Sequence, residues 1–486
     1  MTQFNNLQPK PIWDFFSQIL TIPRPSDQEE LVREHLIEFA QNRGLDHEVD
    51  SAGNLMIRKK ATPGMEKRQS VCLQSHLDMV CEKNSDIDFD FLKDPIPAYV
   101  DDDGWIKSRG TTLGADDGIG IAAQMAILDS HDIAHGPLEC LFTVAEETGL
   151  TGAFGLGEGL IKSRILLNLD SEDEGEIFIG CAGGIDLTAW LTFEKVNTPA
   201  NSEAFAVTVT GLRGGHSGDD IHKGYGNANK IINRFLRIIK DQLSASLHDL
   251  EGGNLRNAIA REAKAIITIN KKDEAQLSSL FEEFKQNMHK ENPVTEPELT
   301  LELSHHSLPD QVLGERSFEQ LINAISACPH GVHAWSQTMP GMVETSTNLA
   351  AIRMEANEVK ITTSQRSSLE SAKEDINQMV TSVFRLANAR CQKSTGYPGW
   401  NPNPDSPILK ISNESYQTLF GTKPQIKAIH AGLECGLFLK KFPDLDMISF
   451  GPTIKGAHSP DERLEISTVT KFWELLIDIL KRIPNA

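Results

Sequence analysis

The stretch Leu141–Gly149, LFTVAEETG, decides how the rest of the chain is interpreted. Its first half is apolar and β-prone, as expected for a strand that is covered on both faces of a parallel sheet. Two adjacent carboxylates, Glu146 and Glu147, follow without a counter-charge. Such a pair must share a proton or lie beside a cation, so it indicates a metal site or a raised pKa. A solvated turn explains this stretch equally well when it is taken alone.

Strand and helix patterns alternate on both sides of this stretch. NLMIRK (54–59), SVCLQSHLD (70–78) and RILLNLD (164–170) have the composition of strands, and IAAQMAILDS (121–130) has a helical pattern. This alternation predicts an α/β domain with a mostly parallel sheet.

The pattern changes near Trp190. FAVTVTGL (205–212) alternates like a half-exposed strand, and GNANKIINRFLRIIK (226–240) is an amphipathic helix. We predict that residues 190–395 form an inserted α+β domain with an antiparallel sheet. Residues 1–189 and 396–486 would then be the two parts of the α/β domain, and the Pro- and Gly-rich stretch 397–407 would be the return linker.

Composition narrows the possible functions. A chain of 486 residues with a net charge of -21 repels polyanions and anionic lipid surfaces, so we expect no nucleic-acid or membrane partner. No targeting segment or membrane span is evident, which predicts a cytoplasmic protein with a small, soluble substrate. The seven cysteines are scattered, which argues against a disulfide framework and against a thiolate zinc cluster.

Side chains that can bind metals or protons recur at the ends of the predicted strands: His76 and Asp78 in SHLDM, Asp116 in GADDG, Glu146, Glu147, Asp170 in NLDSE and His458 in GAHSPDE. The carboxyl ends of parallel strands meet along one sheet edge, so these side chains can converge. Imidazoles and carboxylates without thiolates suit Zn²⁺, Mn²⁺ or Co²⁺. Two divalent cations carry about +4, which balances about three carboxylates and a bridging hydroxide. Each residue alone fits a turn or a helix cap as well, and only the joint pattern favours a metal site.

His76 and Asp78 are two residues apart, so they share one face of an extended chain. This spacing lets Asp78 orient the imidazole of His76 and does not require Asp78 to bind the metal itself.

Several motifs together resemble those of the co-catalytic zinc peptidases, a family that includes glutamate carboxypeptidase, aminoacylase and dipeptidases. The motifs are SHLDMV, TTLGADDGIG, TVAEETG, LLNLDSE, GGHSG, AGLECG and GPTIKGAHSPDE, and the resemblance covers essentially the whole chain. It implies that His76 and Asp170 hold one metal, that Glu147 and His458 hold the other, that Asp116 bridges them, that Asp78 orients His76 and that Glu146 is the general base. Similar sequences often have GADNG where this chain has GADDG, so Asp117 is a second candidate for the bridge.

The same resemblance implies residues that contact the substrate. They are His216, which would stabilise the transition state, Asn257 and Arg366, which would grip the substrate carboxylate, and His430, Gly432 and Glu434, which would line the pocket. Arg is well suited to a carboxylate because its two-pronged donor geometry matches the two oxygens.

The activity that the resemblance implies is hydrolysis of dipeptides, of the Xaa-His kind including β-Ala-His, by a metal-bridged hydroxide with Glu146 as base. The resemblance also implies that residues 1–189 and 396–486 form the catalytic domain and that residues 190–395 form a lid and dimerisation domain, whose closure would exclude water. A homodimer is expected. An N-acyl amino-acid deacylase or a carboxypeptidase on the same scaffold remains an alternative, as does a catalytically silent metal-containing binding protein.

Overall fold

The computed structural model describes residues 4–486, which form two compact units. Unit 1 contains residues 4–180, 402–428 and 433–486, and unit 2 contains Cys181–Asn401 and Ile429–Gly432. Along the chain, unit 2 is therefore inserted between the parts of unit 1. Trp190, near which the sequence pattern changes, lies inside a strand of unit 2.

Unit 1 is built around an eight-stranded sheet. Its strands lie in the order β1 (Asp46–Val49), β2 (Leu55–Lys59), β6 (Leu138–Thr143), β3 (Val71–His76), β7 (Ile165–Asn168), β21 (Asp446–Ser449), β8 (Glu176–Cys181) and β20 (Gln425–Ile429). The central strands β6, β3, β7 and β21 are parallel to one another. Antiparallel pairing is found among β1, β2 and β6 and between β21 and β8. The predicted α/β class is confirmed, with the parallel pairing at the centre of the sheet.

Every residue of β3, β6 and β7 is buried. The helices of unit 1 are α1 (Lys10–Ile19), α2 (Glu30–Asn42), α3 (Ala115–Asp129), α4 (Thr151–Gly155), α9 (Pro407–Phe420), α10 (Glu434–Lys441) and α11 (Ile466–Arg482). Helix α3 is apolar on nearly all sides, and it packs against both α1 and β3. A helix with this composition is stable only when it is buried, so it fixes the position of the Asp116 turn at its start.

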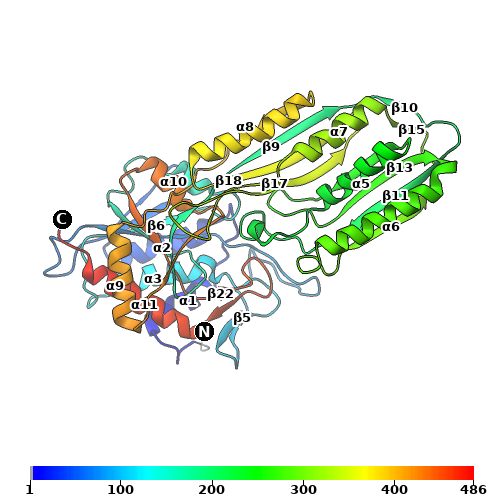
Figure 1. Cartoon of the computed structure of the whole chain (residues 1–486). Coiled ribbons are helices and arrows are strands. Elements are labelled where there is room, and N and C mark those ends of the chain that lie inside the picture. The colour runs from blue at the N-terminus through cyan, green and yellow to red at the C-terminus, as the bar shows by residue number, and fades with distance from the viewer. Residues whose placement is uncertain (1–3) are drawn as a thin grey trace. The chain divides into compact units, whose positions relative to one another are not determined.

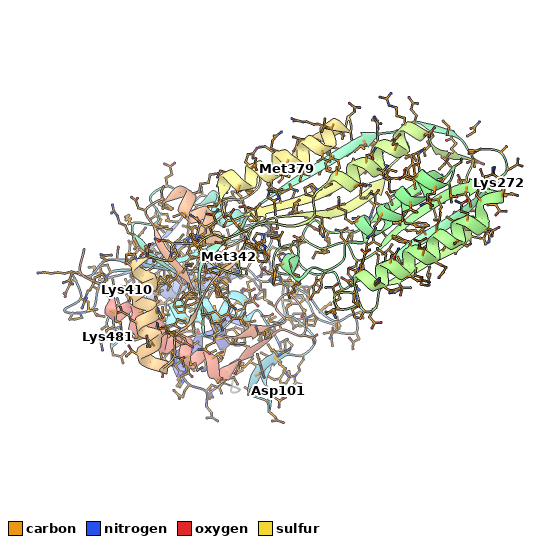
Figure 2. The ribbon with its side chains drawn as sticks, viewed as in Figure 1. Asp101, Lys272, Met342, Met379, Lys410 and Lys481 are labelled. Atoms are coloured by element: carbon orange, nitrogen blue, oxygen red, sulfur yellow. The ribbon has the colours of Figure 1, made fainter. Side chains whose placement is uncertain are left out.

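Helices α9 and α11 pack on each other, and α9 also contacts β21 (Figure 1). The start of α9 is set by Ser406, whose side chain accepts a hydrogen bond from the backbone N–H of Leu409, and by Pro407 in the first turn. Lys410 on α9 and Lys481 on α11 are exposed (Figure 2). These two helices thus bury one face and keep charged residues on the other.

A four-stranded sheet in unit 1 has the order β22 (Ile454–Lys455), β23 (Arg463–Glu465), β5 (Trp105–Ser108) and β4 (Ala98–Val100). Strand β23 pairs with β5, with Leu464 opposite Ile106. This pairing joins the segment that leads to Asp116 with the segment that follows His458, although the two are far apart in sequence.

Unit 2 is built around a nine-stranded antiparallel sheet. The order is β14 (Thr300–His306), β11 (Ser202–Thr210), β13 (Ala263–Asn270), β12 (Ser246–Gly252), β17 (Val343–Met354), β18 (Glu358–Ser367), β9 (Gly183–Thr192) and β19 (Arg390–Lys393), with β16 (Gly331–Trp335) paired to β17. A separate pair is formed by β10 (Lys195–Asn197) and β15 (Gln311–Leu313).

The helices of unit 2 are α5 (Ala228–Gln242), α6 (Glu274–Glu291), α7 (Glu315–Ala327) and α8 (Glu370–Leu386), with short 3₁₀ turns at Ile221–Lys223 and Lys271–Asp273. Helices α6 and α7 each contact α5, and the three lie along the sheet in Figure 1. Phe235 of α5 is fully buried, and its ring centroid lies 5.3 Å from that of Phe281 and 5.2 Å from that of Phe284, both on α6. This aromatic cluster joins α5 to α6.

Within residues 4–486, no helix combines the length and the apolar character that crossing a lipid bilayer requires.

Candidate metal centre and active site

Unit 1 brings the predicted strand-end residues to one edge of its central sheet. His76 is the last residue of β3, Glu146 and Glu147 follow β6, and Asp170 follows β7. Because these three strands are adjacent and parallel, their carboxyl ends meet at the same edge. Asp116 reaches this edge from the first turn of α3, and His458 reaches it from the loop between β22 and β23.

Asp116 lies between the two histidines. Nε2 of His76 is 3.0 Å from Oδ1 of Asp116, and Nε2 of His458 is 3.3 Å from Oδ2 of the same carboxylate. Asp170 is on the side of His76, with 3.4 Å between Oδ1 and Nε2. Glu147 is on the side of His458, with 3.0 Å between Oε2 and Nε2. The five side chains thus form two groups that share one carboxylate.

The neighbouring Asp117 has a different orientation. Its Oδ1 accepts a hydrogen bond from the backbone N–H of Gly120 at 3.1 Å, and its Oδ2 accepts one from the backbone N–H of His76 at 3.3 Å. Asp117 is 1% exposed. Since its oxygens bind the backbone, Asp116 is the member of the pair that faces both imidazoles.

Asp78 connects several parts of the cluster. Its Oδ1 lies 3.3 Å from Nδ1 of His76 and accepts the backbone N–H of Glu146 at 3.0 Å. Its Oδ2 accepts the backbone N–H of Glu147 at 3.2 Å and the hydroxyl of Ser26 at 2.7 Å. Burial opposes ionisation, but these hydrogen bonds, the one with His76 foremost, lower the pKa of Asp78 to about 2. A carboxylate that is fixed in this way orients the imidazole and the turn that carries both glutamates.

The carboxylates around the two histidines raise the pKa of both rings. Hydrogen bonds to Asp116 and Glu147 raise the pKa of His458 to about 11. Burial would lower the pKa of His76, but the charge of Asp170 and the hydrogen bonds with nearby carboxylates raise it well above its usual value. Burial would raise the pKa of Asp116, yet hydrogen bonds from both imidazoles hold it well below its usual range. Positive charge is therefore strongly favoured at both positions.

Unlike the pKa of Asp116, the pKa values of several other carboxyl groups in the cluster are raised. Burial raises the pKa of Asp170 to about 7, and it raises those of Glu172 and Glu434 to about 8. The pKa of Glu146 is raised well above its usual value, first by burial and then by repulsion from carboxylates that include Asp170. The cluster thus holds more carboxyl groups than its two histidines can neutralise.

This donor set fits two divalent cations. His76, Asp116 and Asp170 offer ligand atoms within 4.8 Å of one another, and so do Asp116, Glu147 and His458. Oε1 of Glu147 is buried and has no hydrogen-bond partner within the described chain. Imidazole nitrogen and carboxylate oxygen without thiolate are the ligands of zinc, manganese and cobalt sites.

Glu462 holds the loop that carries Asp116. Its carboxylate accepts the backbone N–H groups of Leu113, Gly114, Ala115 and Asp116, at 2.7, 2.9, 2.7 and 3.3 Å respectively. Glu462 is 3% exposed and follows His458 by four residues. One buried carboxylate therefore fixes two candidate metal-binding segments relative to each other.

Arg24 provides a second buried support. Its guanidinium donates to the carbonyl oxygens of Leu77 at 3.0 Å, of Asp78 at 2.6 Å and of Gly114. Arg24 is 2% exposed. A side chain added at Gly114 would place its Cβ 2.7 Å from Nη2 of Arg24, so the absence of a side chain there is required. The guanidinium of Arg24 thus binds both the loop that carries Asp78 and the loop that carries Asp116.

Glu434 lies in the interior of unit 1. Its Oε2 accepts hydrogen bonds from the side chains of Gln74 at 2.6 Å and Thr143 at 2.8 Å, and Oε1 is buried without a partner in the described chain. Gln74 in turn accepts a hydrogen bond from the side chain of Asn168 at 2.6 Å. Glu434 is 0% exposed, so none of its surface is open to a substrate in this structure, and its contact with substrate stays a prediction.

Unit 2 holds a separate cluster around Arg366 of β18. Nη2 of Arg366 is 3.4 Å from Nε2 of His216, and Nη1 donates to the hydroxyl of Tyr397 at 2.9 Å. His430 is 7% exposed, and its Nε2 is 2.7 Å from the hydroxyl of Ser346, which lies opposite Arg366 on β17. Burial and the nearby positive charges lower the pKa of His430 to about 3.

The remaining candidates of unit 2 border this cluster. Asn257 has an exposed side chain, and its carbonyl accepts the N–H of Ser217, next to His216, at 2.8 Å. A Cβ added at Gly432 would lie 2.7 Å from the ring of Tyr397. Unit 2 therefore gathers Arg366, His216, His430 and Gly432, with Asn257 on the adjoining loop.

The sequence model of peptidase family M20/M25/M40 matches residues 72–482. The chain belongs to this peptidase family.

Two relatives match the peptidase along its whole length. The cytosol non-specific dipeptidase of Escherichia coli (strain K12) is 46% identical over 484 residues, which is 100% of both chains. The solved structure of aminoacylhistidine dipeptidase from Vibrio alginolyticus has a TM-score of 0.92 and 44% identity, and it covers 100% of this chain and 99% of that one. A tripeptidase from Staphylococcus aureus, with 18% identity, a TM-score of 0.58 and coverage of 98% and 99%, has the same fold. The resemblance that was drawn from the motifs is confirmed.

Sequence reasoning missed three residues that organise the peptidase's two clusters: Arg24, Glu462 and Tyr397. Glu462 had a visible signal, because it lies in the same motif as His458. Arg24, between two prolines, had none, since its partners are backbone carbonyls. Tyr397 lies in a segment that was interpreted only as a linker.

Proposed function

We propose that this peptidase is a two-metal dipeptidase that cleaves short peptides, Xaa-His dipeptides such as β-Ala-His among them. The observation that carries the proposal is the position of Asp116, whose two oxygens each face a different histidine, with half-buried Glu146 close by. The full-length similarity to a non-specific dipeptidase and to an aminoacylhistidine dipeptidase supports the substrate class.

His76 and Asp170 would hold one cation, Glu147 and His458 the other, and Asp116 both. Zinc is the proposed cation, and manganese or cobalt would also suit these ligands. Two divalent cations at these positions would polarise the peptide carbonyl and lower the pKa of a water molecule.

Glu146 is the proposed general base. A nitrogen of His76 and one oxygen each of Glu146 and Glu147 lie within 4.8 Å of one another, so Glu146 borders the metal-binding side chains. Burial raises its pKa, which helps a carboxylate to accept a proton from water and then pass it to the departing amine. Asp78 keeps the turn of Glu146 in place by accepting its backbone N–H.

The cluster of unit 2 is the proposed site for the rest of the dipeptide. Arg366 would bind the C-terminal carboxylate, as its guanidinium offers two parallel donors. His216 would donate a hydrogen bond to the oxygen of the peptide bond that is cleaved, and Asn257 would assist in binding. His430 and Gly432 would shape the pocket around these groups, and Glu434 would meet the free amino group.

The substrate class can be tested by comparing two kinds of product. The purified protein, loaded with Zn²⁺, is given Ala-His and β-Ala-His in one set of reactions and acetylated amino acids in another. Release of free histidine from the dipeptides, at rates well above release of acetate, is the expected result. Faster release of acetate would identify an N-acyl amino-acid deacylase and contradict the proposal.

The role of Glu146 can be tested with Glu146→Gln, which keeps the size of the side chain and removes the base. We expect kcat to fall by about 10²-fold to 10⁴-fold while bound metal stays the same. Glu158→Gln changes an exposed glutamate of the same unit and should keep normal kcat. Unchanged turnover in Glu146→Gln would reject the assigned base.

We also infer a cytoplasmic location and a homodimer. The cytosolic relative supports the first. Light scattering on the purified protein measures the second directly, and a monomer at assay concentrations would contradict it.

A further inference from the structure

The guanidinium of Arg366 has a donor to spare. Nη1 donates to the hydroxyl of Tyr397, and Nη2 lies next to Nε2 of His216. Nε of Arg366 is buried and has no hydrogen-bond partner among residues 4–486. Leaving a charged donor buried and unpaired is costly, so this arrangement favours an anionic ligand.

Three hydrogen bonds hold the backbone of Tyr397 in place. Its backbone N–H donates to the carbonyl of Gly184 at 2.9 Å, and its carbonyl accepts the N–H of Gly184 at 3.1 Å. Nζ of Lys373 donates to the same carbonyl at 2.6 Å. These bonds attach the segment after β19 to the start of β9.

The ring of Tyr397 lies in a slot between two glycines. A Cβ at Gly184 would come within 2.6 Å of the ring, and one at Gly432 would come within 2.7 Å. Neither contact is compatible with a real side chain. The absence of side chains at these two positions thus determines where the hydroxyl points, which is at Arg366.

The hydroxyl of Tyr397 still has its hydrogen to donate. It accepts a hydrogen bond from Arg366, and the described chain contains no hydrogen bond from this hydroxyl to another residue. Burial raises the pKa of Tyr397, so the proton is retained at neutral pH. A phenol that accepts from a guanidinium becomes a better donor, because the two hydrogen bonds polarise each other.

We propose that Tyr397 is a specificity-determining residue, which together with Arg366 binds the C-terminal carboxylate of the substrate and so selects peptides with a free carboxyl end. Arg366 supplies the charge and Tyr397 supplies a neutral donor from a fixed direction. A carboxylate has two oxygens that can accept hydrogen bonds from both Arg366 and Tyr397. A C-terminal amide has one such oxygen, and its NH₂ group cannot accept a hydrogen bond from the second donor. This inference rests on the proposed function of Arg366.

The test compares a dipeptide with its C-terminal amide in the metal-loaded enzyme. The wild type should cleave Ala-His with a kcat/KM well above that for Ala-His amide. In Tyr397→Phe we expect kcat/KM for Ala-His to fall about tenfold or more, through KM, while the value for the amide stays within about twofold. Tyr225→Phe, a matched change elsewhere in unit 2, should leave both values unaltered.

A double mutant separates direct binding from mere support of Arg366. If Tyr397 binds the carboxylate itself, adding Tyr397→Phe to Arg366→Ala lowers kcat/KM for Ala-His further. If the added change has no effect, Tyr397 acts only by positioning Arg366, and the inference is overturned. Thermal unfolding of each variant checks that the fold is retained.

The outcomes also separate this inference from the proposed function. A wild type that cleaves no peptide would reject the dipeptidase proposal as a whole. A wild type that cleaves the acid and the amide equally would reject the carboxylate role of Arg366. A wild type that prefers the acid, with the same preference in Tyr397→Phe, would reject only the role of Tyr397.

Discussion

The two candidate clusters of this peptidase have opposite electrostatic character. In unit 1, carboxyl groups outnumber the histidines, and a buried oxygen of Glu147 has no partner in the described chain. In unit 2, Arg366 and two histidines lie together, and a buried N–H of Arg366 has no partner there. One cluster is suited to cations and the other to an anion. A dipeptide needs both, because its peptide carbonyl must be polarised and its carboxylate must be anchored.

The clusters also differ in how they are supported. The loops of unit 1 are held by the buried charges of Arg24 and Glu462, which bind backbone groups. In unit 2, the guanidinium of Arg366 donates a hydrogen bond to the neutral hydroxyl of Tyr397. The ring of Tyr397 lies between Gly184 and Gly432. Changes to these supports in unit 1 should therefore affect metal binding, whereas changes to Arg366 or Tyr397 in unit 2 should leave the bound metal unaltered.

The largest effect is expected from Asp116→Asn, which alters the carboxylate whose two oxygens lie 3.0 Å from His76 and 3.3 Å from His458. An amide offers one oxygen and cannot serve both groups. We expect bound metal to fall by at least one ion per chain and kcat to fall by about 10³-fold, equivalent to about 4 kcal/mol. Elemental analysis after dialysis and turnover assays measure the two effects. Asp132→Asn, at an exposed position, is the control, and full metal content in Asp116→Asn would argue against a shared ligand.

A smaller effect, confined to the substrate, is expected from Arg366→Lys. Lysine keeps the charge but loses the two-pronged geometry, so KM for a dipeptide should rise by about 10-fold to 100-fold. Metal content should stay equal to that of the wild type. Arg385→Lys on α8, where the side chain is exposed, is the matched control. A loss of metal in Arg366→Lys would break the distinction between the two clusters.

Glu462→Gln tests whether the support in unit 1 acts through the metal. The side-chain nitrogen of glutamine accepts no hydrogen bond, so some of the backbone N–H groups of Leu113–Asp116 would lose their acceptor. Loss of such a support is expected to weaken metal affinity by about 10-fold to 100-fold, and excess metal should restore activity. Titration of the metal-free protein with Zn²⁺ measures this affinity. Glu474→Gln on α11 is the exposed control, and an unchanged affinity in Glu462→Gln would reduce Glu462 to a purely structural residue.

The smallest effect concerns stability in unit 2. The pKa of His430 is about 3 in the folded protein, below the value near 6.5 that is usual for the unfolded chain. Between these values the unfolded state binds one more proton, so the free energy of unfolding falls as the pH falls, by about 1.4 kcal/mol per pH unit. His430→Asn should remove this contribution and flatten the slope. Denaturant unfolding at several pH values between about 4 and 6 measures it, and parallel slopes would contradict the assignment.

Much of the fold follows from local patterns. The apolar runs that form β3, β6 and β7 are long and bounded by turns, so their burial at the centre of a parallel sheet was predictable. The position of His76 and the glutamates at the ends of such strands indicated a common edge. The antiparallel pairing of β1, β2 and β8 was not evident, because strand direction depends on distant partners.

The supporting residues were beyond sequence reasoning for a physical reason. Glu462 binds backbone N–H groups that lie about 350 positions earlier, and backbone groups leave no trace in side-chain patterns. Tyr397 lies in a stretch whose prolines and glycines are typical of a linker, yet the stretch pairs with Gly184 at the start of β9. Glycines 184 and 432 are far apart in the chain, so the slot that they form becomes visible only in three dimensions.

The position of β21 between β7 and β8 has a consequence for the cell that makes this enzyme. A ribosome releases the N-terminal part first, so the sheet of unit 1 lacks a central strand, and the cluster lacks His458, until the segments that contain them have been made. We therefore expect a chain that ends before Asp446 to lack peptidase activity, because it holds neither β21 nor His458.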